Sequence, residues 1–206
     1  MVRVISKTAF ALTLGAVTML GACKKSDTAT DTTMAATDTS MKAGAMSSTS
    51  MNAAATPAPV TDAGIFAALA AANQGEIDAG KMAESKATTA AVKSFAHDMV
   101  IAHTAMLNSG NVLAKKLNIT PDVAAADSID MMNKATAAAL SAASKGAGFD
   151  SAYVNAQVVG HQYVLDMIKR DESAAQNAEL KSALTSAEPK VQAHLDRIKA
   201  IQGKLK

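Results

Sequence analysis

The 206-residue sequence has no tryptophan, two tyrosines, four phenylalanines and a single cysteine. With so few aromatic side chains, the core has to be built from Ala, Val, Leu, Ile and Met, and this composition favours close-packed helices over sheets. One cysteine cannot supply a framework of intramolecular disulfides, which requires an even number. Lys and Arg form no cluster, so the sequence argues against a nucleic acid partner.

The N-terminal residues have the order of a secretory signal. Arg3 and Lys7 precede an apolar stretch from Thr8 to Leu20, and about 13 residues are too few for a transmembrane helix. We therefore predict a cleaved signal peptide over residues 1–22. Its removal takes two of the 20 basic residues and none of the 18 acidic ones, so the mature chain carries no net charge.

The signal ends in Leu20-Gly21-Ala22-Cys23, which resembles the lipobox of bacterial lipoproteins. This motif predicts lipidation of Cys23, and several acyl chains on one residue would hold the protein firmly on a membrane. Lys24-Lys25 then favours the periplasmic face of the outer membrane, if the host is Gram-negative. An ordinary secreted protein with an unmodified cysteine is the alternative.

Residues 23–60 form a predicted tether between the lipid and the folded domain. They consist mainly of Thr, Ala, Ser, Asp and Met without apolar periodicity, which predicts disorder. Thioethers are suitable ligands for Cu(I), so the methionines of this segment could also form a loose copper-collecting arm, although the composition favours a plain linker. These methionines are Met34, Met41, Met46 and Met51.

Residues 61–206 have the length of one domain, and helical periodicity dominates them apart from the segment 118–148. Apolar residues recur at steps of three and four, which predicts long helices over about 62–86, 89–117, 150–172 and 175–203. The second and third are separated by roughly 30 residues that include a short, Ala-rich helix. We therefore expect an all-α, ferritin-like four-helix bundle with a long crossover containing a short fifth helix.

Two local features of these helices give further expectations. Asp150 is a suitable N-cap for the third long helix, with Phe149 and Val154 placed to form a hydrophobic staple. Pro189 falls inside the last helix, where we expect a kink.

Four polar residues lie on the apolar stripes of the long helices, one on each: Glu76, His103, His161 and His194. The helix lengths place them at compatible levels of the bundle. Three imidazoles and a carboxylate would suit Zn, Fe or Cu. Alternatively, the histidines form a satisfied polar network or cap buried carbonyls. His97 lies off its stripe, and we expect it to be solvated.

Iron oxidation at a dinuclear centre is a weaker hypothesis. Such centres use a Glu-x-x-His step on two helices, but valine stands three residues before each stripe histidine, at Val100, Val158 and Val191. The sequence also has no Ser-His-Asp set and no phosphate-binding loop. Enzymatic activity is therefore not indicated.

Residues from about Ile65 to Leu205 resemble domain of unknown function family 4142, whose members are ferritin-like envelope proteins often carried on lipoprotein anchors. The family commonly has an acidic residue before the histidine of the second helix, where this chain has Ala102. The resemblance implies a fold and a location but no established activity. It rests on Ala72-Asn73-Gln74-Gly75-Glu76-Ile77-Asp78-Ala79-Gly80-Lys81, Val92-Lys93-Ser94-Phe95-Ala96 with Met99-Val100 and His103, Phe149-Asp150 with Tyr153 and His161, and Pro189 with His194-Leu195.

The sequence as a whole favours an envelope lipoprotein that acts as a binding or structural, stress-related helical module. A metal-binding or redox protein that uses the His and Glu cluster is the alternative. The sequence identifies no protein partner or small ligand.

Overall fold

The computed structural model describes residues 60–205. The predicted signal peptide, Cys23 and the four methionines of the tether lie outside these residues. Within the described part the chain forms helices and no strand, and none of its helices is long and apolar enough to cross a membrane. The elements are α1 (Asp62–Lys86), α2 (Ala90–Lys116), the 3₁₀ helix η1 (Val123–Ala126), α3 (Asp127–Ala142), α4 (Ala147–Ala174) and α5 (Ala178–Gln202).

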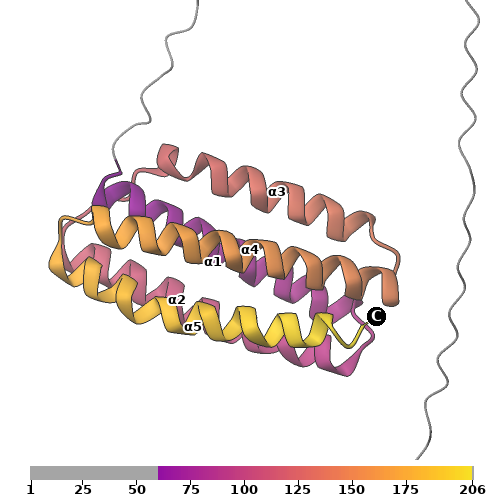
Figure 1. Cartoon of the computed structure of the whole chain (residues 1–206). Helices are drawn as coiled ribbons and strands as arrows, with labels where there is room; N and C mark the ends of the chain where they lie inside the picture. The colour runs from indigo at the N-terminus through magenta and orange to yellow at the C-terminus, as the bar shows by residue number, and fades with distance from the viewer. Residues whose placement is uncertain (1–59, 206) are drawn as a thin grey trace, which may run out of the picture. The chain divides into compact units, whose positions relative to one another are not determined.

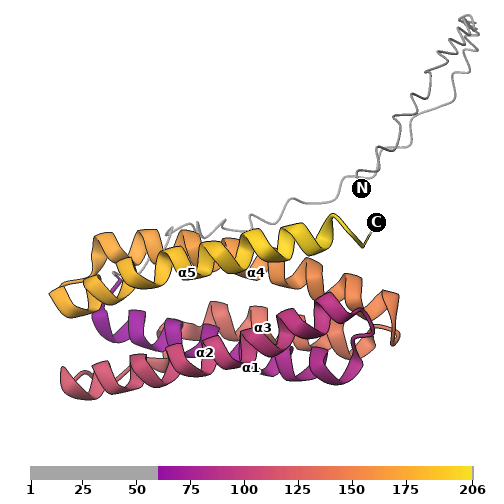
Figure 2. The ribbon, with the colours of Figure 1, turned by 90° about the horizontal axis from the view of Figure 1, so that it is seen from below.

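Two antiparallel hairpins make up the bundle (Figures 1 and 2). Helix α1 packs along α2, and α4 packs along α5, whereas contacts between α2 and α5 are fewer. The crossover from α2 to α4 contains η1 and α3, and α3 lies along α1 and α4. This arrangement confirms the predicted all-α, four-helix bundle with a fifth helix in its crossover.

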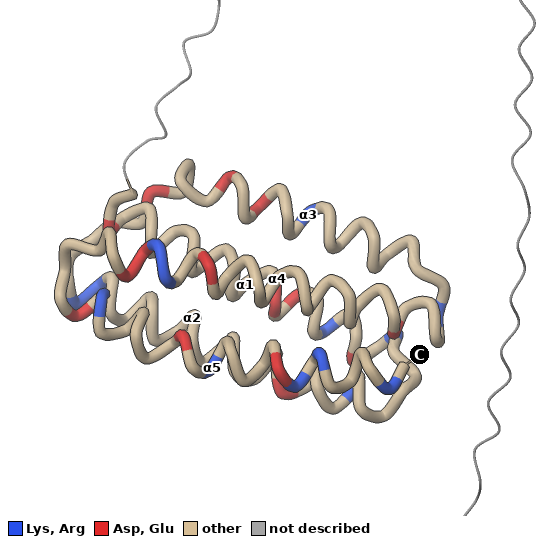
Figure 3. The backbone as a smooth tube through the Cα atoms, in the orientation of Figure 1, with Lys and Arg blue, Asp and Glu red and all other residues tan. Residues whose placement is uncertain are grey.

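The core is mostly aliphatic, as the composition predicts, but the few aromatic residues of the domain also contribute to it, since Phe66, Phe95, Phe149 and Tyr153 are buried. Each long helix buries one stripe. On α2, for example, Val92, Phe95, Met99 and His103 are buried at steps of three and four residues. Close contact between α1 and α2 depends on Gly80, because a Cβ there would lie 2.7 Å from a methyl carbon of Val100. Basic and acidic positions are intermixed along the bundle (Figure 3).

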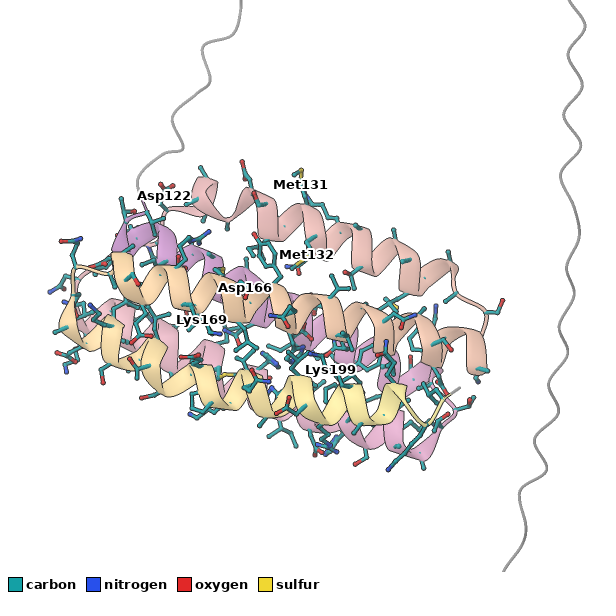
Figure 4. The ribbon with its side chains drawn as sticks, viewed as in Figure 1. Asp122, Met131, Met132, Asp166, Lys169 and Lys199 are labelled. Carbon is teal, nitrogen blue, oxygen red and sulfur yellow. The ribbon has the colours of Figure 1, made fainter. Side chains whose placement is uncertain are left out.

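Helix α3 covers α1 through a small apolar cluster and several polar contacts, among them the bonds from the Lys86 ammonium group to the carbonyls at the end of α3. The buried residues of the cluster are Ala68, Ala72, Ile129 and Met167. Met132 packs against this cluster, between α3 and α4, whereas Met131 points away from the bundle (Figure 4). The Asn133 side chain donates a hydrogen bond to the Ala71 carbonyl at 2.9 Å. A Cβ on Gly75 would lie 2.1 Å from the Asn133 side-chain oxygen, so glycine is needed there for α3 to approach α1.

Asp150 is not the N-cap of the third long helix, which was a wrong prediction. Helix α4 begins at Ala147, because Gly146 adopts a φ of 99° that L side chains rarely accept and so starts the helix earlier. The Asp150 carboxylate instead accepts hydrogen bonds from the backbone and hydroxyl groups of Thr88 and Thr89, at the start of α2. It therefore ties the α1–α2 loop to α4.

Helix α5 continues through Pro189 as one helix. The proline therefore does not end α5, while a bend at this point stays a prediction. One turn earlier, the Thr185 hydroxyl oxygen lies 2.7 Å from the Glu172 carboxylate and 3.1 Å from the Lys181 carbonyl. The shorter contact links α5 to the C-terminal part of α4.

Candidate metal centre

Three histidines from three helices meet inside the bundle. His103 of α2, His161 of α4 and His194 of α5 each present one ring nitrogen, and these nitrogens all lie within 4.8 Å of one another. The ring centroids are separated by 5.4, 5.6 and 5.7 Å. Because each histidine lies on the apolar stripe of its helix, packing of the stripes brings the three rings to one level. The structure therefore unites the three histidines predicted from the sequence.

Asn73 determines which nitrogen of His103 carries a proton. The Asn73 amide group donates to the Leu69 carbonyl at 2.7 Å, so its oxygen is the atom that faces His103. This oxygen lies 2.9 Å from Nδ1 of His103. Since a carbonyl oxygen can only accept, Nδ1 carries the hydrogen and Nε2 is left with a lone pair.

The second histidine has the same tautomer for a different reason. Nδ1 of His161 lies 3.0 Å from the backbone carbonyl of Gln157, one turn earlier on α4. Nδ1 therefore donates its hydrogen to this carbonyl, and Nε2 again has the lone pair. In metal sites, a hydrogen bond of this kind from the remote ring nitrogen fixes the orientation of a ligating imidazole.

Each of the three rings also has a buried nitrogen without a hydrogen-bond partner among the described residues. These atoms are Nε2 of His103, Nε2 of His161 and Nδ1 of His194. Burying a polar atom without a partner costs free energy. A network of protein groups alone therefore does not satisfy these atoms, whereas a shared cation would.

Two histidines of the cluster, His103 and His194, stay neutral well below physiological pH. Burial lowers the pKa of His103 to about 3, and repulsion by His161 and His194 contributes to this shift. Burial also lowers the pKa of His194 to about 4, assisted by His161 and Arg197, although Asp98 acts in the opposite direction. Neutral imidazole is the form that binds metal ions, so these two rings need lose no proton at pH 7.

Glu76, the fourth predicted ligand, lies beside the three nitrogens rather than among them. One carboxylate oxygen is 3.9 Å from Nδ1 of His161, and the other accepts a hydrogen bond of 2.6 Å from the Gln157 amide. The carboxylate thus faces the side of the His161 ring that is remote from the cluster. In this position Glu76 supplies a negative charge near the site.

The spacing of the three nitrogens fits a single transition-metal ion after small adjustments. Zinc binds imidazole nitrogen at about 2.0–2.1 Å, which places ligand nitrogens about 3.3–3.6 Å apart. The three nitrogens lie within 4.8 Å of one another, so their separation exceeds that of bound ligands by little more than an ångström at most. Small side-chain rotations of three rings that already converge would close the difference.

An apolar cavity of about 240 Å³ adjoins the cluster and has His103 and His161 in its wall. It extends from these histidines toward the end of the bundle where α4 joins α5. Residues from all four long helices line it, namely Leu69, Ala72, Asn73 and Glu76 of α1, His103, Met106, Ser109, Gly110 and Leu113 of α2, His161, Val164 and Ile168 of α4, and Ala183, Leu184, Ala187 and Val191 of α5.

Two functional positions, Asn73 and Gln157, were not recognised as such from the sequence. Both lie on the stripes that carry the site, so the available signal was a second set of polar residues at core positions, one helical turn from Glu76 or His161.

His97 was predicted correctly as solvated. Its side chain is 64% exposed and pairs with Glu84 on the surface.

Comparisons with known proteins agree with this fold. The family model described as Domain of unknown function (DUF4142) matches residues 46–201, which confirms the resemblance drawn from the sequence. A solved structure entitled "CopM in the Cu(II)-bound form" is similar with a TM-score of 0.58 and 15% sequence identity, over 72% of this chain and 99% of that chain. At this identity the likeness concerns the fold alone. No curated protein gives a significant match.

Proposed function

The chain belongs to the family described as Domain of unknown function (DUF4142). From the geometry of the histidine cluster, we propose that it binds one divalent transition-metal ion through His103, His161 and His194. The observation that carries the proposal is the set of three buried, partnerless nitrogens within 4.8 Å of one another. The hydrogen bonds of Nδ1 leave lone pairs on Nε2 of His103 and Nε2 of His161, and these lone pairs repel each other inside the cluster. A cation between them would remove this repulsion.

The chemistry of the donors favours Cu(II), followed by Zn(II). Imidazole suits both ions, and Cu(II) binds a given set of nitrogen ligands more tightly than Zn(II) does. The structural neighbour is titled as Cu(II)-bound, which supports copper. Iron is less favoured, because the Glu76 carboxylate faces away from the three nitrogens and the Asp98 carboxylate, which acts on His194, is paired with Arg197.

Metal titration of the full chain tests this proposal. We expect the wild type to take up one equivalent of Cu(II) or Zn(II) at this site, and the His161→Ala variant to lose that equivalent. His97→Ala is the matched control, because this histidine is exposed and outside the cluster. Any metal bound by residues outside the cluster, such as Cys23, would be the same in all three proteins and would cancel in the comparison.

Two outcomes would overturn the proposal. One is a wild-type chain that takes up no stoichiometric Cu(II) or Zn(II). The other is an unchanged stoichiometry and affinity in His161→Ala. Because alanine at a buried site can disturb folding, circular dichroism of the variant should accompany the titration, and His161→Gln, which keeps more of the side-chain volume, provides a second test.

We also propose that the bundle works at the cell envelope, held there by lipid on Cys23. The support is the order of basic residues, apolar stretch and lipobox before this cysteine. The Cys23→Ser variant should accumulate as an uncleaved precursor without acyl chains. Normal maturation of this variant would contradict the proposed anchor.

A further inference from the structure

We propose that the cavity beside the three histidines binds a small organic anion with an apolar tail, whose anionic group completes the coordination of the metal ion. This inference rests on the proposed metal site and assigns a ligand class to it. Three protein ligands leave a coordination position open, which is typical of zinc sites that bind exogenous molecules rather than of structural ones. The cavity reaches two of the three ligating rings.

The polar groups in the cavity wall leave the metal as the place where an anionic group can be recognised, because the Glu76 carboxylate would repel it. The Asn73 side chain is already paired with Leu69 and His103. The Glu76 carboxylate accepts a hydrogen bond from Gln157, and the Ser109 hydroxyl donates to the Ala105 carbonyl. The unsatisfied polar atoms of the wall are Nε2 of His103 and Nε2 of His161.

The charge balance at the site favours an anion. Three neutral imidazoles leave the charge of a divalent ion unchanged, and the Glu76 carboxylate, 3.9 Å from the His161 ring, offsets about half of it. Among the described residues that line the cavity, no other carries a formal charge. A monoanionic ligand would therefore make the buried site neutral, and burying a neutral set costs least.

The apolar remainder of the cavity wall suits a ligand whose hydrocarbon part is extended. Along α1 and α4 the lining extends seven residues from the level of the site, from Glu76 to Leu69 and from His161 to Ile168. At 1.5 Å per residue this is about 10–12 Å. The volume of about 240 Å³ also far exceeds the roughly 10–15 Å³ that one water needs. The shape fits a medium-length aliphatic chain.

The opening of the cavity lies between α2 and α5. Ser109 and Ala183 are exposed lining residues on these two helices, which pack together less closely than either packs with its hairpin partner. Gly110 stands next to this opening, and no atom lies within 4 Å of the position that its Cβ would take. A larger side chain at position 110 would therefore occupy space that the ligand needs.

Calorimetric titration of the full chain with straight-chain carboxylates tests the inference. The probes are acetate, butanoate, hexanoate and octanoate, added to the zinc-loaded and to the metal-free protein. We expect the affinity for the zinc-loaded protein to rise about fourfold per methylene, the change that corresponds to burial of one CH₂. Removal of zinc should weaken octanoate binding at least tenfold.

Gly110→Leu should weaken octanoate binding at least tenfold and leave zinc uptake unchanged. Gly148→Leu, at the exposed start of α4, is the matched control and should leave both unchanged. Three results would overturn this inference alone. The affinity of the zinc-loaded protein could be independent of the length of the carboxylate, or octanoate binding could survive Gly110→Leu, or it could survive removal of zinc. A protein that takes up neither Zn(II) nor Cu(II) overturns the proposed function and this inference together, and a protein that takes up Cu(II) alone is titrated with the same carboxylates in its copper-loaded form.

Discussion

The side-chain oxygen of Asn73 accepts a hydrogen bond from Nδ1 of His103 at 2.9 Å, and this contact leaves the lone pair of the ring on Nε2, inside the histidine cluster. Asn73 is itself oriented by its bond to the Leu69 carbonyl. One backbone carbonyl on α1 thus determines, through Asn73, how a ring on α2 faces the centre of the bundle.

Replacing Asn73 with alanine should weaken metal binding about 10- to 100-fold, the usual cost of removing a partner that orients a ligating histidine. The measurement is a competition titration against a chelator of known affinity. Asn73→Asp retains an acceptor for Nδ1 and should restore binding. Gln74→Ala changes the exposed neighbouring residue and serves as the control. Equal affinities for Asn73→Ala and wild type would show that Asn73 does not position His103.

Glu76→Gln should reduce the affinity for a divalent ion on the order of tenfold, because it removes the negative charge beside His161 and keeps a similar shape. The number of ligands seen by X-ray absorption should stay the same, since Glu76 lies outside the group of three nitrogens. Loss of one oxygen ligand in this variant would instead identify Glu76 as a direct ligand, as the sequence had suggested.

The free energy of unfolding of the metal-free protein should fall as the pH is lowered from about 6.5 to 4. Histidines in the unfolded chain have a pKa near 6.5, whereas the pKa of His103 is lowered to about 3 and that of His194 to about 4. The unfolded state therefore binds more protons throughout this range, so acid favours it.

Urea unfolding at several pH values checks this expectation. His103→Leu should show a shallower loss of stability with falling pH than the wild type, whereas His97→Ala should follow the wild type. An equal slope in His103→Leu and wild type would show that burial of His103 does not contribute to the pH dependence.

Asp150→Asn should destabilise the protein by about 2–3 kcal/mol, because an amide cannot replace a carboxylate that accepts several hydrogen bonds at once. Burial on its own would raise the pKa of Asp150, but the bonds from Thr89 and Thr88 lower it below 3.8. The stability that this carboxylate provides is therefore complete above pH 3.8 and is lost as the pH falls through its folded value.

Thermal unfolding at neutral pH measures this difference. Asp166→Asn, on the exposed face of α4, is the matched control and should change stability little. If the two variants are equally stable, the attachment of the α1–α2 loop to α4 does not depend on Asp150.

The apolar stripes predicted the bundle well, because steps of three and four residues determine which face of a helix is buried. They also placed His103, His161 and His194 in the core at similar levels, which is why the metal hypothesis could be stated before the structure was known. The tautomers could not be predicted, since they depend on contacts of Asn73 across helices and on the orientation of the His161 ring.

The start of α4 was misjudged for a similar reason. A local capping rule favoured Asp150 as an N-cap, but the backbone freedom of Gly146 moved the helix start. The Asp150 carboxylate instead accepts hydrogen bonds from a loop roughly 60 residues away in sequence.

The cavity could not be predicted either, because it arises from how far apart α2 and α5 pack rather than from a pattern in either helix.

X-ray absorption of the full chain loaded with one equivalent of Cu(II) tests the shared metal site most directly. We expect three imidazole nitrogens around the copper in the wild type and in His97→Ala, and fewer in His194→Ala. Coordination by sulfur in place of these nitrogens, or a spectrum unchanged by His194→Ala, would contradict it.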